Sequence, residues 1–204
     1  MIETQGKILD TAERLFGEHG YAGTSLRQII AEAGVNLAAI HYHFGNKEEL
    51  LDRLVLRKAG PVNEERLALL DGLEKEAGSS PVPLEKLLRA FLEPPLRRIK
   101  ENPELGRLMG RLYGEGLMPM IAERHFMTVK NRFTAAFGRA LPQLTGQEVE
   151  LRLQFMLGAM AHTMLFVCRQ FSIDANLLVR ELVAFIVGGM GAPAVLGEKT
   201  EENK

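Results

Sequence analysis

Side chains able to bind a nucleic acid gather between Asn36 and Lys47, a stretch without any acidic residue. Its polar members are uncharged or weakly basic donors, which suit contacts with phosphates and with the edges of bases. Ala38 and Ala39 are small, so a helix that carries them lets its backbone come close to a partner surface. The other residues that this stretch would present are Leu37, His41, Tyr42 and His43.

Two short helices at a sharp angle are predicted to position these side chains. The first, residues 25–32, has one apolar stripe and a capping-box spacing between Ser25 and Gln28. Gly34 supplies the backbone freedom that a tight turn needs, and the second helix spans about residues 36–44. Such a pair is the sequence form of a helix-turn-helix, whose second helix enters the major groove, although plain structural hairpins share the pattern.

The next helix begins at Lys47, because Asn46 is a good cap and Glu49 has capping-box spacing. The free N–H groups of its first turn and the Lys47 ammonium together form a natural site for a phosphate. Before these helices, an amphipathic helix over about residues 3–19 is predicted to hold the helix pair at its angle.

The segment 31–51, AEAGVNLAAIHYHFGNKEELL, resembles the helix-turn-helix signature of the tetracycline-repressor (TetR) family of transcriptional regulators. The preceding segments FGEHGY and TSLRQI are similar to the rest of that family's DNA-binding domain. The resemblance covers roughly residues 5–55 in order and without gaps, so it is far more specific than a generic helix-turn-helix. The chain departs from the family pattern at His41, where Tyr is frequent, and at Asn36, where Ser is common.

The resemblance implies an all-α homodimer whose two reading helices bind half-sites of a near-palindromic operator. The implied phosphate contacts come from Thr24, Arg27, Tyr42 and Lys47, and the base-edge contacts from Asn36, Leu37, Ala38 and His41. Ser25 and His43 complete the predicted DNA-binding set. A small-molecule effector in the larger domain would release the DNA. Repression is the commoner mode in the family, and activation stays open.

The length of the chain limits its division into domains, and its charge raises an alternative to the DNA-binding function. The 204 residues fit a DNA-binding domain over 1–58, a helical regulatory and dimerisation domain over 59–197, and a disordered tail over 198–204. Residues 1–58 carry seven Lys and Arg against eight Asp and Glu, which is unusual for a DNA reader. The alternative is therefore a helical ligand-binding protein of the same fold that no longer reads DNA.

The composition also favours a cytoplasmic protein. Cys168 is the only cysteine, so no intrachain disulfide forms, and a reducing compartment fits. Charged residues interrupt any apolar run at the N-terminus, so no signal peptide is expected there. The longest uncharged run, residues 182–197, is too short and too rich in glycine to span a membrane.

Apolar periodicity predicts the remaining helices. The helix from Lys47 should end before Gly60-Pro61, and another should cover 62–77. Pro94 and Pro95 should kink or break a helix over 84–101. Further helices are predicted at 103–116 and, as one long element, from Pro119 to about 141.

The last two helices are predicted to form a dimer interface. The first, about residues 146–171, is capped by Thr145 and Glu148 and is apolar on nearly every face in its middle. The second, about residues 175–188, begins at the cap Asp174. Together they suit a two-fold four-helix interface between two copies of the chain.

No catalytic constellation is present, so we expect no enzyme and no cofactor. The sequence has neither a glycine-rich phosphate loop nor a nucleophile elbow. His41 and His43 lie two residues apart and point about 200° apart on a helix, so they cannot share a metal ion.

The resemblance further implies an effector pocket in the larger domain. Met156, Met160 and Met164 recur at helical spacing, which suits either an adaptable apolar pocket or ordinary core filling. The polar side chains considered for orienting a ligand are Arg98, Tyr113, His125 and His162.

Overall fold

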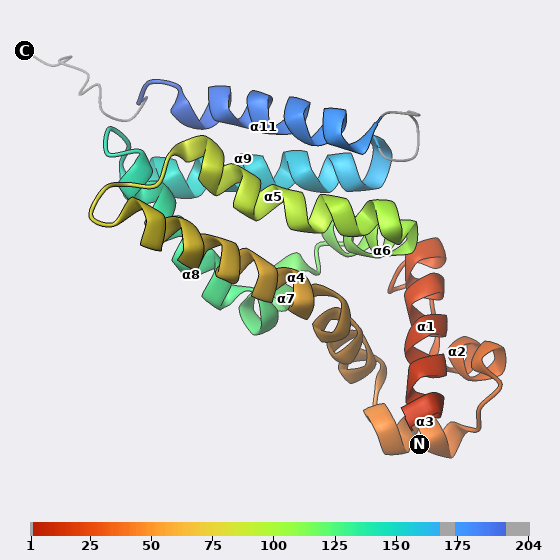
Figure 1. The fold of residues 1–204 in the computed structure, drawn as a ribbon. Coiled ribbons are helices and arrows are strands. Elements are labelled where there is room, and N and C mark those ends of the chain that lie inside the picture. The colour runs from red at the N-terminus through yellow and green to blue at the C-terminus, as the bar shows by residue number, and fades with distance from the viewer. Residues whose placement is uncertain (1, 168–173, 195–204) are drawn as a thin grey trace, which may run out of the picture.

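The computed structural model describes residues 2–167 and 174–194, and within them the chain is all-helical. Ten α-helices and one π-helical segment are assigned over these residues, without any strand, which confirms the predicted fold class. Figure 1 shows α1, α2 and α3 grouped at one end, and α4 running from this group into the larger helical bundle. None of the helices in the described ranges has the length and hydropathy needed to cross a membrane.

The N-terminal group consists of α1 (Ile2–His19), α2 (Leu26–Ala33) and α3 (Leu37–Phe44). Its helix bounds agree with the predicted ones to within a residue or two at each end. One core joins these helices to the start of α4 and to α6 and α7, and its largest fully buried members include Phe16, Ile29 and Ile40. The N-terminal helices therefore pack directly on the larger bundle and are not attached by α4 alone.

The helix α4 spans Lys47–Ala77 without interruption, so the predicted break at Gly60-Pro61 is wrong. Pro61 removes one ladder hydrogen bond, to the carbonyl of Arg57. Leu54 and Ala59 before Pro61 and Val62 and Leu70 after it are all buried, so packing on both sides of Pro61 keeps the helix continuous. The helix instead changes direction along its length (Figure 1), as proline-containing helices do.

The helix α5 (Leu84–Glu101) also continues through Pro94 and Pro95, as a helix that bends rather than breaks would. The two prolines leave the carbonyls of Ala90 and Phe91 without their usual helical donors. The Nε atom of Arg66, on α4, donates to the Phe91 carbonyl at 2.8 Å. A side chain of the neighbouring helix thus replaces one of the two lost hydrogen bonds.

The bundle continues with α6 (Pro103–Gly114), α7 (Met118–His125) and α8 (Met127–Ala140). The single long helix predicted from Pro119 is wrong, because the chain turns at Phe126. Phe126 packs against the core shared with the N-terminal helices, whereas α8 packs against α5 and α9. The segments before and after Phe126 therefore pack against different neighbours, which one straight helix could not contact.

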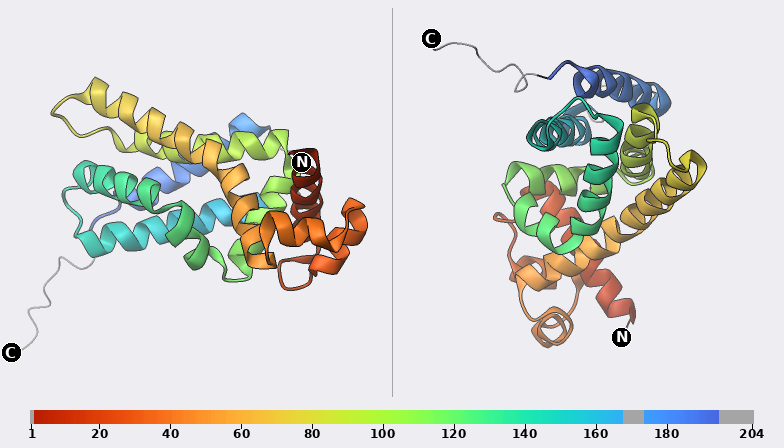
Figure 2. Two further views of the ribbon diagram at one scale, coloured as in Figure 1. Left: turned by 90° about the horizontal axis from the view of Figure 1, so that it is seen from below. Right: turned by 90° about the vertical axis from the view of Figure 1, so that its left-hand side faces the viewer.

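The last elements are α9 (Gly146–His162), a π-helical segment η1 (Thr163–Val167) and α11 (Ala175–Gly191). The predicted caps Thr145 and Asp174 are both confirmed. The expected α-helix over 146–171 changes to π-helix at Thr163, whose hydroxyl donates to the Ala159 carbonyl at 2.9 Å. The rest of that prediction, and the predicted tail at 198–204, lie outside the described residues. In Figures 1 and 2, α9 and α11 lie side by side at the edge of the bundle.

Candidate nucleic-acid interface

The helix pair α2 and α3 is fixed by its own caps. The Ser25 hydroxyl accepts from the Gln28 backbone N–H while the Gln28 side chain accepts from the Ser25 N–H, which completes the predicted capping box. Gly34 ends α2 with φ of 64°, a left-handed conformation that favours glycine. Asn36 then caps α3 by accepting from the Ala39 N–H at 2.8 Å. The turn between the helices is therefore built as the sequence predicted.

The helix α3 divides into a buried face and an open face. Ile40 and Phe44 are fully buried against α1 and α4. Asn36, Ala38 and His41 are exposed, and 76 % of the Tyr42 surface is accessible. His43 is half-buried, and the side chain of Leu37 lies outside what the structure describes. The open face consists of residues that the sequence assigned to base edges and phosphates.

The ring of His41 is oriented by the end of its own helix. Its Nδ1 atom lies 2.9 Å from the Gly45 carbonyl oxygen. Since a carbonyl only accepts, Nδ1 carries a proton in this contact. His41 thus presents a defined hydrogen-bonding edge at the exposed face of α3.

Lys47 lies at the first turn of α4, where Asn46 accepts from the Glu49 N–H as predicted. Its Nζ atom lies 4.2 Å from the centre of the Tyr21 ring. Burial against this ring lowers the pKa of Lys47, and the nearby Glu115 carboxylate opposes the shift. The ammonium of this first residue of α4 is therefore held over the Tyr21 ring.

Thr24 has a role in the fold that the sequence did not predict. Its side chain is buried, and the hydroxyl lies 3.1 Å from the Leu15 carbonyl and 2.8 Å from the Gly20 carbonyl. It therefore ties the start of α2 to the end of α1. A hydroxyl enclosed in this way does not face a surface phosphate, so the phosphate contact predicted for the Thr24 side chain is not supported.

The acidic balance of residues 1–58 is compensated within the fold. Seven of the eight acidic side chains form ion pairs, and Glu49 instead bonds the Asn46 amide. The seven are Glu3, Asp10, Glu13, Glu18, Glu32, Glu48 and Asp52. Arg27 and Lys47, by contrast, form no ion pair with any residue of the described ranges. The acidic side chains of this segment are therefore largely paired, whereas these two cations are not.

The residues considered for a ligand do not converge on one site. Met156 and Met164 are buried in the core of the bundle and Met160 partly so, whereas the exposed His162 ring stacks on Phe166. Tyr113, which is 41 % exposed, points toward Gly158.

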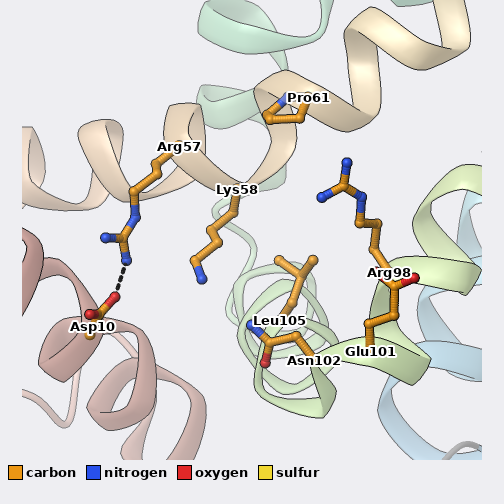
Figure 3. Close-up of a pocket in the computed structure, with 8 residues that line it drawn as sticks. All are labelled: Asp10, Arg57, Lys58, Pro61, Arg98, Glu101, Asn102 and Leu105. Atoms are coloured by element: carbon orange, nitrogen blue, oxygen red, sulfur yellow. Dashed lines mark hydrogen bonds and ion pairs between the residues drawn. The ribbon is translucent and has the colours of Figure 1, made fainter.

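Arg98 lines a polar surface pocket of about 380 Å³, between α4 and the helices α1, α5 and α6 (Figure 3). The other residues that line it are Asp10, Arg57, Lys58, Pro61, Glu101, Asn102 and Leu105. None of the predicted ligand residues except Arg98 belongs to this pocket.

His125 joins two segments of α4. Its Nε2 atom lies 2.8 Å from the Asp52 carboxylate, and its backbone carbonyl accepts from the Asn63 amide at 3.1 Å. Asp52 precedes Pro61 and Asn63 follows it, so one residue of α7 bridges α4 across its proline. Sequence spacing could not indicate Asp52 as the partner of His125, because the two residues lie 73 positions apart.

Sequence reasoning missed Arg66. The residue is 3 % exposed in the middle of α4 and has no acidic partner among the described residues. A signal was present, because position 66 lies at helical spacing between Val62 and Leu70 on the apolar stripe. A charged residue at such a position is rarely buried without a reason.

Two family models match the chain. The model of bacterial regulatory proteins of the tetR family matches residues 8–54, and a tetracyclin repressor-like C-terminal domain matches residues 89–189. A probable HTH-type transcriptional regulator, YttP of Bacillus subtilis, is 43% identical over 54 residues, and the regulator TtgR of Pseudomonas putida is 45% identical over 53. The matched part covers 26% of this chain and of YttP, and 25% of TtgR, so it is confined to about a quarter of each chain.

Solved structures match over nearly the whole chain. HlyIIR, a hemolysin II transcriptional regulator, is 25% identical with a TM-score of 0.63, covering 94% of this chain and 98% of that one. A tetR-family regulatory protein from Rhodococcus RHA1 has the same coverage, 18% identity and a TM-score of 0.67, and supports the fold alone.

Proposed function

Because the chain belongs to the TetR family of bacterial transcription regulators, we propose that it is a dimeric repressor that an effector releases from its operator. The family is one of regulators and not of enzymes. The observation that carries the DNA-binding role is the open face of α3. This face is free of acidic residues, and Arg27 and Lys47, which form no ion pair within the described ranges, lie in the first turns of the neighbouring helices α2 and α4. Residues 1–58 would form the reading domain, and residues 59–197 the regulatory and dimerisation domain.

The proposed contacts follow from the exposure of each side chain. Asn36, Ala38 and His41 would face base edges, together with Leu37 at the start of the helix. Arg27, Tyr42 and Lys47 would contact phosphates, and Ser25 and His43 would lie at the margin of the same surface. The backbone N–H groups at the start of α4 would add to the phosphate contact of Lys47.

The proposed dimer rests on the apolar surface of the last helices. Large apolar side chains are exposed along α9, η1 and α11, where a second copy would cover them. They are Leu151, Phe155, Phe166, Leu177 and Phe185. A two-fold pairing of these helices would present two copies of α3 to successive major grooves, which matches a near-palindromic operator.

The first experiment is binding of the purified protein to fragments of the DNA upstream of its own gene, over a salt series. We expect one fragment to bind saturably, with two subunits per site. Its affinity should fall by about 10³-fold between ~50 and ~200 mM salt, because phosphate contacts release counterions. A fragment of equal length from inside the coding region is the control.

Failure of every fragment to bind at low salt would favour the alternative, a helical ligand-binding protein that no longer reads DNA. Only the acidic composition of residues 1–58 favours that alternative. The ion pairs of seven of its eight acidic side chains weaken it.

A further inference from the structure

Arg66 is a cation enclosed in the core of the larger bundle. Its guanidinium carbon lies 4.0 Å from the centre of the Phe91 ring, and the side chain reaches three acceptors. Nε donates to the Phe91 carbonyl at 2.8 Å, Nη1 to the Asn63 side-chain oxygen at 3.3 Å, and Nη2 to the Met160 sulfur at 3.8 Å. All three acceptors are neutral, and no carboxylate in the described ranges pairs with this residue.

Part of this arrangement has a structural reason. Pro95 has no N–H, so the Phe91 carbonyl lacks its helical donor, and Arg66 Nε replaces it. That bond needs one N–H donor, whereas a guanidinium carries five donors and a full positive charge. A neutral donor would serve the carbonyl at a lower desolvation cost. The Phe91 carbonyl explains why a donor is needed at the position of Nε. It does not explain why the side chain that supplies this donor carries a positive charge.

The far end of the guanidinium is poorly satisfied. A thioether is a weak acceptor, and 3.8 Å is a long contact. Burial lowers the pKa of Arg66 to about 9, so the side chain is still charged at neutral pH. A buried cation without a counter-ion is costly, and it attracts any anion that can reach it.

We propose that Arg66 binds the carboxylate of an apolar effector, which displaces the Met160 sulfur from Nη2. This inference rests on the proposed function and names the chemical class of the effector. A carboxylate fits because one negative charge balances one guanidinium, and its two oxygens match the fork of the terminal nitrogens. A doubly charged phosphate would leave an excess charge in the same apolar surroundings.

The surroundings indicate an apolar body for this ligand. Phe91, Met156 and Met164 are buried members of the same core, and Met109 and Met160 are partly buried against it. Methionine is unbranched and adaptable, so these side chains can move aside for an aliphatic or aromatic group. In this proposal the polar group that binds the ligand beside these methionines is Arg66. The sequence had instead suggested Arg98, Tyr113, His125 and His162 for that role.

The site is connected to the reading domain by hydrogen bonds. The Asn63 side chain accepts from Arg66 and donates to the His125 carbonyl, and the His125 ring pairs with Asp52 near the start of α4. An anion on Arg66 would compete for the N–H that Asn63 accepts. Effector binding would thereby alter the contact between α7 and α4.

The test is thermal unfolding of the full chain with straight-chain carboxylates from hexanoate to hexadecanoate and with benzoate and 2-naphthoate. Each is compared with its methyl ester, which has the same skeleton without the charge. We expect at least one carboxylate to raise Tm by ~5 °C at saturation while its ester does not. If no carboxylate exceeds its ester, the proposal is wrong, and this comparison requires no variant.

Substitutions of single arginines test whether Arg66 is the residue that binds the carboxylate. Arg66→Gln should abolish the carboxylate-dependent rise in Tm, whereas Arg97→Gln should retain it, because Arg97 lies exposed on α5 and pairs with Glu65. Arg66→Lys keeps the charge and serves if the Gln variant does not fold; it should bind the same carboxylate more weakly. A rise that survives in both Arg66 variants, or that Arg98→Gln removes instead, would overturn the assignment.

The readout separates this inference from the proposed function. Thermal unfolding is measured without DNA, so a protein that fails to bind any operator can still show the carboxylate effect. Conversely, intact operator binding with no carboxylate effect refutes only the role of Arg66.

Discussion

At the scale of single residues, Lys47 and His41 are built for different tasks. The Lys47 ammonium is held over the Tyr21 ring at a helix start, where in the proposed complex it would meet the phosphate charge that every DNA sequence shares. The exposed His41 ring is fixed by its bond to the Gly45 carbonyl, and in the proposed complex its other nitrogen would meet groups that differ between base pairs. Position and partners, more than residue type, separate the two roles.

Substituting these two residues should therefore give different binding profiles. Lys47→Ala should weaken binding to all operator variants by a similar factor and reduce the salt slope by about one. His41→Ala should change the preference between operator variants by about 1 kcal/mol or more at one position of each half-site. Titration of both variants against a set of single-base operator changes tests this. If both lower every affinity equally, the assignment of His41 to a base is refuted.

The roles of these residues were predictable where their hydrogen-bond partners lie close by in the sequence. The caps Ser25, Asn36 and Asn46 each bond the N–H group three positions away, so their spacing in the sequence was enough. Thr24 and Arg66 were misread or missed because their partners come from another helix. Burial of a polar side chain depends on that packing, which a single sequence does not display.

At the scale of elements, α6 fixes the turn between α1 and α2. The Glu115 carboxylate, at the end of α6, accepts from the Tyr21 and Ala22 backbone N–H groups, both at 3.1 Å. Arg111, one turn earlier, donates to the Glu18 carbonyl at 3.3 Å. The larger bundle thus bonds the backbone of the reading domain directly, close to Lys47.

Loss of the Glu115 carboxylate should loosen this contact. We expect Glu115→Ala to lower the free energy of unfolding by about 1–2 kcal/mol, because two charge-assisted hydrogen bonds to backbone are lost at an exposed site. Amide exchange at Tyr21 and Ala22 should speed up as well. Urea denaturation and hydrogen exchange measure the two effects.

Glu123→Ala is the matched control, since Glu123 is exposed on α7 and forms no ion pair within the described residues. Equal stability losses in the two variants would mean that Glu115 acts only through general charge and not through its bonds to the turn.

Helix positions were well predicted, and helix continuity was not. Pro61 was expected to end the helix that begins at Lys47, yet α4 continues past it. Its buried side chains before Pro61 pack in the N-terminal core, and Leu70 after it packs in the core that includes α5. Phe126 gave no local signal for a break, yet the chain turns there because α7 and α8 pack on different neighbours. Local propensity locates a helix, whereas tertiary packing decides where it ends.

At the scale of the whole molecule, the surface of the last helices is unusually apolar. Phe155 is 66 % and Phe185 74 % exposed, on α9 and α11. A soluble monomer rarely leaves such a patch open to water, so this surface supports the proposed pairing of two copies. The N-terminal helices lie at the opposite end of the molecule from the C-terminal end of α11 in Figure 1.

A charge on this surface should separate the dimer. We expect Phe185→Asp to shift the chain to a monomer in analytical ultracentrifugation, because a buried, unpaired carboxylate is costly in an interface. Operator affinity should fall by at least ~100-fold, since the second half-site no longer binds intramolecularly.

Leu69→Asp is the control, because Leu69 is also exposed but lies on α4. If Phe185→Asp stays dimeric at micromolar concentration, the proposed interface is wrong.

The bridge that His125 forms across Pro61 has a mechanical consequence for α4. Lys47 and Arg66 lie nineteen positions apart, or ~28 Å along a helix that rises ~1.5 Å per residue. On a lever of that length, a tilt of only ~5° displaces the far end by ~2.5 Å, close to the length of one hydrogen bond. A flexible hinge at Pro61 would absorb so small a rotation. With Asp52 and Asn63 both bonded to one residue of α7, the parts of α4 before and after Pro61 would turn together, and an angular change at the core would reach the proposed DNA-binding face.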